Sequence, residues 1–154
     1  MEHKGFQELV ADAKKKITEI FPIDAASKTK SSDAVIVDVR ENDEWDDEHI
    51  PDAVHMSRGM LELEIEDKFP DRNTTIICHC GGGGRSALAA ESLQKMGYKN
   101  VRSMTGGFKA WKAAEALLRE FSSQATSGAP ATPRSARRRL YLSTAANKHR
   151  LDSS

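Results

Sequence analysis

The sequence predicts an α/β fold, a doubly wound and mostly parallel sheet of five strands flanked by helices on both faces. Apolar spacing alternates along the chain between the helical period of about 3.6 residues and continuous runs typical of strands. The run 35–37 is apolar at every position, as in a parallel strand that is covered on both sides. Strands separated by helices need crossover connections, so the ligand site is expected at the carboxyl ends of the strands.

The first half of the fold is expected to contain two helices and three strands. Apolar residues within 6–19 recur at i, i+3 and i+4, which predicts an amphipathic helix. A short extended segment is expected at 21–23, with a weak helix after Asp24. The buried strand 34–39 follows, and Val54 marks a third short strand.

The second half is expected to alternate regularly and to show no internal repeat. The predicted elements are a helix at 59–68, a strand at 74–79, a helix at 86–96, a strand at 101–103 and a final helix at 108–121. Gly97 stands where a glycine commonly ends a helix.

The 154 residues, 38% of them hydrophobic and 30% charged, suffice for one domain with a small core. We expect residues 1–120 to form this domain and residues 121–154 to be a basic, disordered C-terminal tail. The tail holds six Lys or Arg and one Asp, a net charge of +5, which leaves −5 for residues 1–120 of the neutral chain. Its arginine run 137–139 is more often solvated than bound to nucleic acid or lipid, so we expect neither partner.

The chain is expected to be cytoplasmic. Its N-terminus lacks the apolar core of a secretion signal, and no segment approaches the roughly 18 apolar residues of a membrane span. Cys78 and Cys80 are separated by one residue, a spacing that rarely allows disulfide geometry. Reduced cysteines are therefore expected.

The segment 76–86 predicts a nucleophile in a loop that binds anions. A β-type stretch runs into Cys80, four glycines, an arginine and a serine. The glycines have no Cβ, so backbone N–H groups can surround a point above the Cys80 sulfur. Ser86 is expected to cap a helix whose positive end points to the same place. Helix N-termini and nearby arginines stabilise the reactive thiolate, so Cys80 is the expected nucleophile.

Four segments together resemble the marks of rhodanese-type sulfurtransferases. The loop CGGGGR is similar to their six-residue active-site loop. VIVDVRENDEW (35–45) resembles their strand that ends in Asp-x-Arg before an acidic turn and an aromatic residue. EHIPDAVHM (48–56) resembles their HIPGA segment, and MTGGFKAW (104–111) resembles their closing glycine pair and tryptophan helix. The match spans roughly residues 6–112, and it implies a single-domain rhodanese-like fold.

The resemblance implies a thiosulfate sulfurtransferase, which moves a sulfane sulfur from a donor such as thiosulfate to cyanide or a thiol. The Cys80 thiolate would attack the outer sulfur of the donor, release sulfite and hold the sulfur as a persulfide for a small-molecule or protein acceptor. No metal and no organic cofactor is expected. The expected substrate-binding residues, through loop backbone and charge, are Gly81, Gly82, Gly83, Gly84, Arg85 and Ser86.

Two other function classes stay open. Phosphatases and arsenate reductases with a cysteine-arginine loop, including relatives of the rhodanese fold, resemble one another in having five residues between the two. Here there are four, and the smaller ring suits a single sulfur atom rather than a phosphate. A non-enzymatic rhodanese-like module that carries sulfur or binds a partner is the main alternative. The presence of Cys80 and Arg85 argues against an inactive module, but it does not separate carrying from catalysing.

Arg85 has two alternative roles. It either adds positive potential to the loop or forms an ion pair, for example with Asp38, that fixes the loop. Asp38 and Arg40 are expected to be structural supports that tie their strand to its neighbours. Trp45 and Trp111 are expected to be packing residues.

Cys78 is expected to pack as a small hydrophobic residue, because free cysteines in buried strands usually do so. Its alternative role is that of a resolving thiol. A zinc site made from Cys78, Cys80 and nearby histidines (His49, His55, His79) is disfavoured, because Cys-x-Cys lacks a second ligand pair and a metal would block the nucleophile.

The HIPGA-like segment departs from the family pattern at Asp52, which stands where relatives often have glycine. Asp52 would therefore have to adopt a backbone angle that glycine tolerates. The family usually ends the last helix after the tryptophan, whereas 113–121 reads as continued helix.

Overall fold

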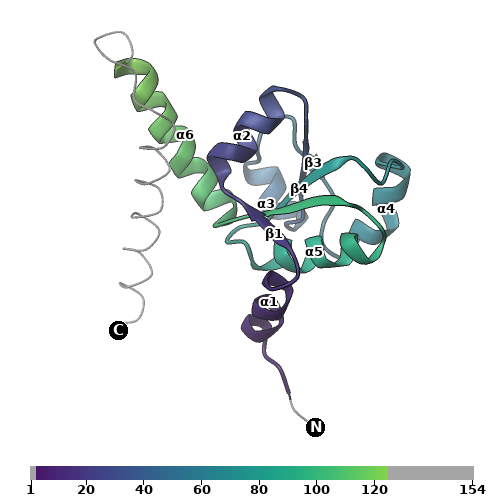
Figure 1. Ribbon diagram of the computed structural model, residues 1–154. Coiled ribbons are helices and arrows are strands. Elements are labelled where there is room, and N and C mark those ends of the chain that lie inside the picture. The colour runs from purple at the N-terminus through teal and green to yellow at the C-terminus, as the bar shows by residue number, and fades with distance from the viewer. Residues whose placement is uncertain (1–2, 125–154) are drawn as a thin grey trace.

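Five parallel strands form the centre of the computed structural model, which describes residues 3–124 (Figure 1). They are β1 (Thr18–Ile20), β2 (Val35–Asp38), β3 (Val54–His55), β4 (Thr75–His79) and β5 (Asn100–Met104). Their order in the sheet is β1-β5-β4-β2-β3, and every neighbouring pair is parallel. The predicted doubly wound sheet of five strands is confirmed, with β4 at its centre.

Helices cover both faces of this sheet, as predicted. They are α1 (Phe6–Lys14), α2 (Pro22–Lys30), α3 (Asn42–Asp47), α4 (Leu61–Lys68), α5 (Gly84–Lys95) and α6 (Gly107–Gln124). Helices α4 and α5 pack on one face, with α1 against α5, while α2 and α6 pack together on the other face. The C-terminal part of α6 extends beyond the sheet (Figure 1).

Alternate residues of β2 and β4 supply the two apolar cores. Val37 and Ile76 point into the core under α4 and α5, whereas Ile36 and Ile77 point into the core under α2 and α6. All four are at most 3% exposed. Because each face is covered by helices, both sets must be apolar, which explains the uninterrupted run in the sequence.

The predicted elements near the N-terminus are partly wrong. Helix α1 ends at Lys14 instead of residue 19, and the next residues form β1, which pairs with β5. Ile20 fits the helical spacing, but it is buried against the sheet because the partner strand supplies its hydrogen bonds. The segment 21–23 is not a strand, since Pro22 begins α2 with a fixed φ that suits a first helical position.

Helix α3 was not predicted. Its six residues contain Trp45 as the one apolar side chain, so no periodic stripe marks it in the sequence. Glu41 and Glu44 form a reciprocal capping box that satisfies N–H groups at its start. The other predicted elements are confirmed with shifts of a few residues at their ends. The expected continuation of the last helix through 113–121 is also confirmed.

Two turns show the backbone angles expected from the sequence. Asp52 has a φ of 67°, so it does adopt a left-handed conformation that glycine tolerates better than other residues. Gly97 has a φ of 94° and directly follows the last turn of α5.

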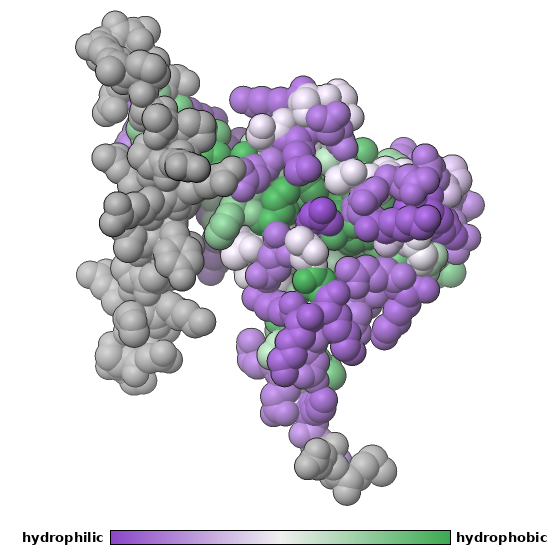
Figure 2. Space-filling model, viewed as in Figure 1, coloured by the Kyte–Doolittle hydropathy of each residue, from purple (hydrophilic) through white to green (hydrophobic). Residues whose placement is uncertain are grey.

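Hydrophilic residues dominate the outline of the face seen in Figure 2, and apolar residues gather toward its middle beside α2. Among the residues described here, no helix is both long and apolar enough to cross a membrane. The boundary predicted after residue 120 falls within α6, which continues to Gln124. The disorder of the basic tail stays a prediction, because residues 125–154 lie outside the described part of the chain.

Candidate active site

Cys80 directly follows β4 at the carboxyl end of the central strand, where the fold class predicts a ligand site. The chain turns through three glycines and then enters α5 at Gly84. Gly83 makes this turn with a φ of 101°, a conformation that side chains with a Cβ rarely adopt. The glycine-rich sequence therefore lets a strand pass into a helix within a few residues, with the cysteine between them.

The Cys80 sulfur lies in a cradle of hydrogen-bond donors. The Gly83 N–H donates to Sγ over 3.1 Å, and the Ser86 N–H donates to it over 3.4 Å. In its protonated form the thiol can donate to Ser86 Oγ, 3.5 Å away. Two backbone donors at the start of a helix favour negative charge on the sulfur. The cradle can therefore hold a thiolate.

Ser86 does not cap α5, which corrects the expectation from the sequence. The helix already begins at Gly84 with Gly83 as its N-cap, since glycines can supply the unusual backbone angles of this turn. Ser86 is thus the third helical residue, and it is buried. Its hydroxyl lies 2.8 Å from the hydroxyl of Ser103 on β5, which fixes the side chain next to the sulfur.

The start of α6 is hydrogen-bonded to the loop. The Phe108 N–H donates to the Cys80 carbonyl oxygen over 2.7 Å, and the Lys109 N–H donates to the Gly81 carbonyl over 3.4 Å. Gly107 allows this close approach, because a Cβ there would lie 2.4 Å from the Cys80 oxygen. The glycine pair 106–107 was noted in the sequence only as a family mark, and its contact with the loop was not predicted.

Arg85 pairs with Glu44 of α3, not with Asp38. Its two terminal nitrogens donate to the two carboxylate oxygens over 2.8 and 3.0 Å. This pairing with Arg85 lowers the pKa of Glu44 to about 2, and the hydrogen bond from Arg85 to Glu44 raises the pKa of Arg85. Glu44 was not expected as the partner of Arg85 because α3 was not predicted. The expected partner was Asp38 at the end of the neighbouring strand.

Asp38 is occupied by Arg40 instead. Arg40 Nη2 lies 2.8 Å from Asp38 Oδ2, and the same nitrogen donates to the Glu48 carbonyl over 2.7 Å. The guanidinium also lies 4.4 Å above the centre of the Phe108 ring. These contacts link β2 to the start of α6, and a supporting role for Asp38 and Arg40 stays our proposal.

His79 is a buried polar group beneath the loop that the sequence analysis did not assign to the site. Its Nδ1 lies 3.4 Å from the Cys80 carbonyl oxygen, and its Nε2 lies 3.4 Å from Asp38 Oδ2 without forming a hydrogen bond. Burial lowers the pKa of His79. The ring is therefore neutral at neutral pH and adds no charge beneath the sulfur.

Cys78 faces the apolar core under α4 and α5 and is fully buried. Desolvation raises the pKa of its thiol to about 12, so it is not ionised at neutral pH. Two histidines of the disfavoured zinc site make other contacts. His49 and His55 stack on the indole ring of Trp45, with ring centroids 3.7 and 4.9 Å away. Within residues 3–124, no three His, Cys, Asp or Glu side chains are grouped as metal ligands.

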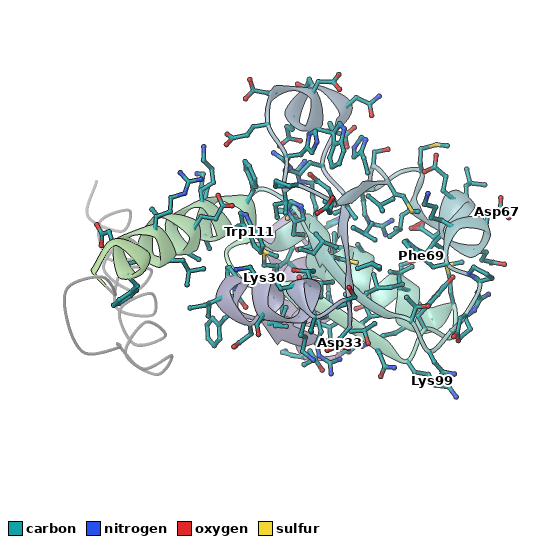
Figure 3. The ribbon with its side chains drawn as sticks, turned by 90° about the horizontal axis from the view of Figure 1, so that it is seen from above. Lys30, Asp33, Asp67, Phe69, Lys99 and Trp111 are labelled. Atoms are coloured by element: carbon teal, nitrogen blue, oxygen red, sulfur yellow. The ribbon has the colours of Figure 1, made fainter. Side chains whose placement is uncertain are left out.

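The glycine loop separates the Cys80 sulfur from solvent. Cys80 itself is 1% exposed, whereas Gly82 is exposed and has no atom within 4 Å of the position of a Cβ. A groove of about 490 Å³ lies elsewhere, between α2, α6 and the start of β2, and Lys30 and Trp111 line it (Figure 3). None of the loop residues lines this groove, so it is separate from the sulfur cradle.

A parallel α/β sheet with a buried thiol in a glycine loop at the end of its central strand defines a class of α/β proteins with a candidate cysteine site. Within this class, the sequence model described as rhodanese-like domain matches residues 22–114, more than half of the chain. The chain belongs to the rhodanese-like domain family.

Two relatives and one solved structure are similar to this chain. The thiosulfate sulfurtransferase GlpE of Coxiella burnetii is 37% identical over 95 residues, which are 62% of this chain and 87% of GlpE. YrkF of Bacillus subtilis, provisionally named a sulfur carrier protein, is 37% identical over 76 residues, 49% of this chain and 40% of YrkF. A Rhodopseudomonas palustris protein of unknown function, described as a possible tyrosine phosphatase, superposes with a TM-score of 0.68 and 36% identity over 75% of this chain and 94% of its own.

Proposed function

We propose that this protein is a sulfurtransferase that carries a sulfane sulfur as a persulfide on Cys80. The Cys80 thiolate attacks the outer sulfur of a donor such as thiosulfate, forms a new sulfur–sulfur bond and releases sulfite. A thiophilic acceptor, cyanide or a thiol, then attacks the bound outer sulfur and releases the Cys80 thiolate. The reaction as proposed uses no metal and no organic cofactor, and it suits a reducing compartment such as the cytoplasm.

The observation that carries this proposal is the pair of backbone N–H groups that donate to Cys80 Sγ from Gly83 and Ser86. The N–H groups of Gly84 and Arg85 belong to the first turn of α5, where no earlier helical carbonyl is available to accept them. We infer that they hold the outer sulfur of the persulfide, whose negative charge the helix N-terminus favours. The loop glycines leave space for this added atom on the exposed side of Gly82.

The likeness to GlpE supports transfer from thiosulfate, and the likeness to YrkF supports a sulfur carrier as the second candidate. Turnover separates the two. Protein incubated with thiosulfate and excess cyanide is expected to release many equivalents of sulfite and thiocyanate per chain, and its Cys80→Ser variant none. Release limited to one equivalent would assign the carrier role, and release that persists in the Cys80→Ser variant would refute the proposal.

A phosphatase is the remaining alternative, and the structural neighbour described as a possible phosphatase makes its test worthwhile. The loop has four residues between Cys80 and Arg85, so it forms a smaller ring than the five residues of cysteine phosphatases. Both terminal nitrogens of Arg85 already donate to the Glu44 carboxylate. We therefore expect the protein to hydrolyse aryl phosphates no faster than its Cys80→Ser variant. Phosphate release that depends on Cys80 would reverse the assignment.

A further inference from the structure

The ion pair between Arg85 and Glu44 lies beside the loop that holds the sulfur. A Cβ placed on Gly81 would lie 3.2 Å from Arg85 Nη2 and 4.0 Å from Glu44 Oε1. Both charged groups are about one third exposed, so they face the solvent from which a sulfur donor arrives. A donor that passes Gly81 therefore meets both groups of the pair.

Glu44 neutralises Arg85 in a fixed geometry. The two side chains form parallel hydrogen bonds of 2.8 and 3.0 Å, and Glu44 also accepts the Glu41 N–H over 2.9 Å in the capping box of α3. The contact with Arg85 holds the pKa of Glu44 at about 2, so its carboxylate stays ionised at every pH at which the protein would act. The arginine of the loop thus contributes little net positive charge.

The surroundings of the pair are acidic. Helix α3 carries three further exposed carboxylates and no basic residue: Asp43, Asp46 and Asp47. Figure 3 shows the side chains of α3 projecting from the upper margin of the molecule. Across the loop, Lys112 is paired with Glu48, and the exposed Lys109 is one positive side chain against three carboxylates.

We propose that the Glu44–Arg85 pair selects an organic persulfide, R–S–S–H, over thiosulfate as the sulfur donor. This inference rests on the proposed persulfide chemistry of Cys80. The Cys80 thiolate attacks the outer sulfur of the donor, the donor's sulfur–sulfur bond breaks, and its electron pair leaves on R–S⁻. The outer sulfur and its proton remain on Cys80 as a persulfide, so no oxidant or reductant is needed.

The physical reason is the group that accompanies the transferred sulfur. In thiosulfate that group is a sulfonate, which carries negative charge and needs an unpaired cation or free N–H donors to replace its water. Here the nearest guanidinium is already bound to a carboxylate, and the backbone donors are directed at sulfur. In an organic persulfide the accompanying group is a neutral alkylthio group, and any negative charge of the donor lies on the transferred sulfur itself. The thiolate that leaves carries one negative charge, whereas the sulfite that leaves from thiosulfate carries two.

The test compares single-turnover loading of Cys80 by thiosulfate and by 2-hydroxyethyl persulfide, followed by intact mass. Glu44→Gln frees Arg85, so we expect it to accelerate loading from thiosulfate about tenfold and to change loading from the persulfide less than twofold. Asp46→Asn makes the same change of net charge on α3 without touching Arg85. We expect this control to change loading from either donor less than twofold.

A double variant tests whether loss of the ion pair by itself disturbs the loop. Glu44→Gln with Arg85→Gln removes both charges and is expected to keep the wild-type preference, because the net charge beside Gly81 is unchanged. Equal changes for both donors in Glu44→Gln, or an equal gain for thiosulfate in Asp46→Asn, would overturn the inference. Failure of the wild-type protein to load from either donor would instead overturn the proposed function.

Discussion

Cys78 and Cys80 lie two residues apart, are both at most 1% exposed and both border the core under α4 and α5, but they differ in the hydrogen-bond donors that face the sulfur. The Cys78 side chain lies within β4 among apolar residues of the core, and desolvation raises its pKa to about 12. The Cys80 side chain lies one residue beyond the strand, where the Gly83 and Ser86 N–H groups donate to its sulfur. Two equally buried thiols can therefore differ in the hydrogen-bond donors that surround them.

The difference arises from the backbone rather than from the neighbouring side chains. Within a strand, the N–H groups are used by the partner strands and cannot turn toward a sulfur. After the strand ends, the Gly83 N–H of the loop and the Ser86 N–H turn toward the sulfur, and the first turn of α5 has N–H groups that no earlier helical carbonyl can accept. A cysteine becomes a candidate nucleophile here because it stands at the junction of strand, loop and helix.

The largest expected difference concerns alkylation of the two thiols. In the Cys80→Ser variant, Cys78 is the one remaining cysteine of the chain. A pKa of about 12, against the ordinary thiol value of 9.0, leaves roughly a thousandfold less thiolate at neutral pH. Iodoacetamide at pH 8 should therefore modify folded Cys78 roughly a thousand times more slowly than the same variant in urea. Comparable rates in the two states would contradict the buried position of Cys78.

The same raised pKa predicts a pH dependence of stability. The unfolded thiol ionises above about pH 9 while the folded one stays protonated, so the stabilisation is complete below pH 9 and declines as the pH rises toward 12. At pH 10 the wild-type protein should lose about 1.4 kcal/mol relative to pH 7, beyond any loss in Cys78→Ala. Urea unfolding at the two pH values measures this difference, and parallel changes in both proteins would contradict it.

A third prediction concerns a variant that disturbs the cradle around the Cys80 sulfur and leaves Cys78 unchanged. In Gly107→Ala the new Cβ would lie 2.4 Å from the Cys80 oxygen, at a φ of 60°, so the loop must move. We expect loading of Cys80 by thiosulfate to slow about a hundredfold, which corresponds to about 2.7 kcal/mol. Gly59→Ala is the control, because it lies outside the loop and no atom lies within 4 Å of its Cβ position, and it should load within threefold of wild type. Normal loading of a folded Gly107→Ala protein would show that the contact with α6 does not shape the loop.

The sequence predicted the sheet, both faces of helices and the loop that follows β4. Apolar runs and consecutive glycines indicate these features. Such patterns are local, so they can be recognised without knowing which segments pair in the fold. The position of β1 was not predictable in this way, because Ile20 fits a helical stripe and only its pairing with β5 makes it a strand.

The partners within the site were predicted less well for a similar reason. Glu44 comes from a short acidic helix whose sequence carries no periodic apolar stripe. Ser103 and Gly107 come from β5 and α6, and only the folded topology brings them to the loop. Ser86 was assigned to the helix start because capping rules favour serine. In the structure, Gly83 is the N-cap and Gly84 is the first residue of the helix.

A smaller effect is expected from the hydroxyl beside the sulfur. Ser86→Ala keeps the backbone N–H that donates to Cys80 Sγ and removes the Oγ contact of 3.5 Å, so loading should slow less than tenfold. It also leaves the buried Ser103 hydroxyl unpaired, at a cost of about 1–3 kcal/mol in unfolding free energy. Ser103→Ala breaks the same hydroxyl pair without touching the sulfur and should destabilise the fold to a similar extent while loading faster than Ser86→Ala. Equal loading of the two variants would assign no role to the Ser86 hydroxyl.

The smallest effect is expected from removal of the basic C-terminal segment. We propose that neither cysteine depends on it, because this segment is rich in Ser, Ala and Thr, carries six basic residues and shows no sustained apolar period with which to pack. A chain ending after Ser123 should keep its melting temperature and its rate of loading with thiosulfate. A tenfold slower loading, equivalent to about 1.4 kcal/mol, would make the segment part of the site.

The most direct measurement is the intact mass of two single-cysteine proteins after treatment with thiosulfate. Cys78→Ser keeps the thiol in the glycine loop, and Cys80→Ser keeps the thiol in the strand. Our account predicts that Cys78→Ser gains the mass of one sulfur atom, that cyanide removes this mass, and that Cys80→Ser gains nothing under the same conditions. A sulfur adduct that appears on Cys80→Ser and is absent from Cys78→Ser would place the chemistry on the other cysteine and contradict the account.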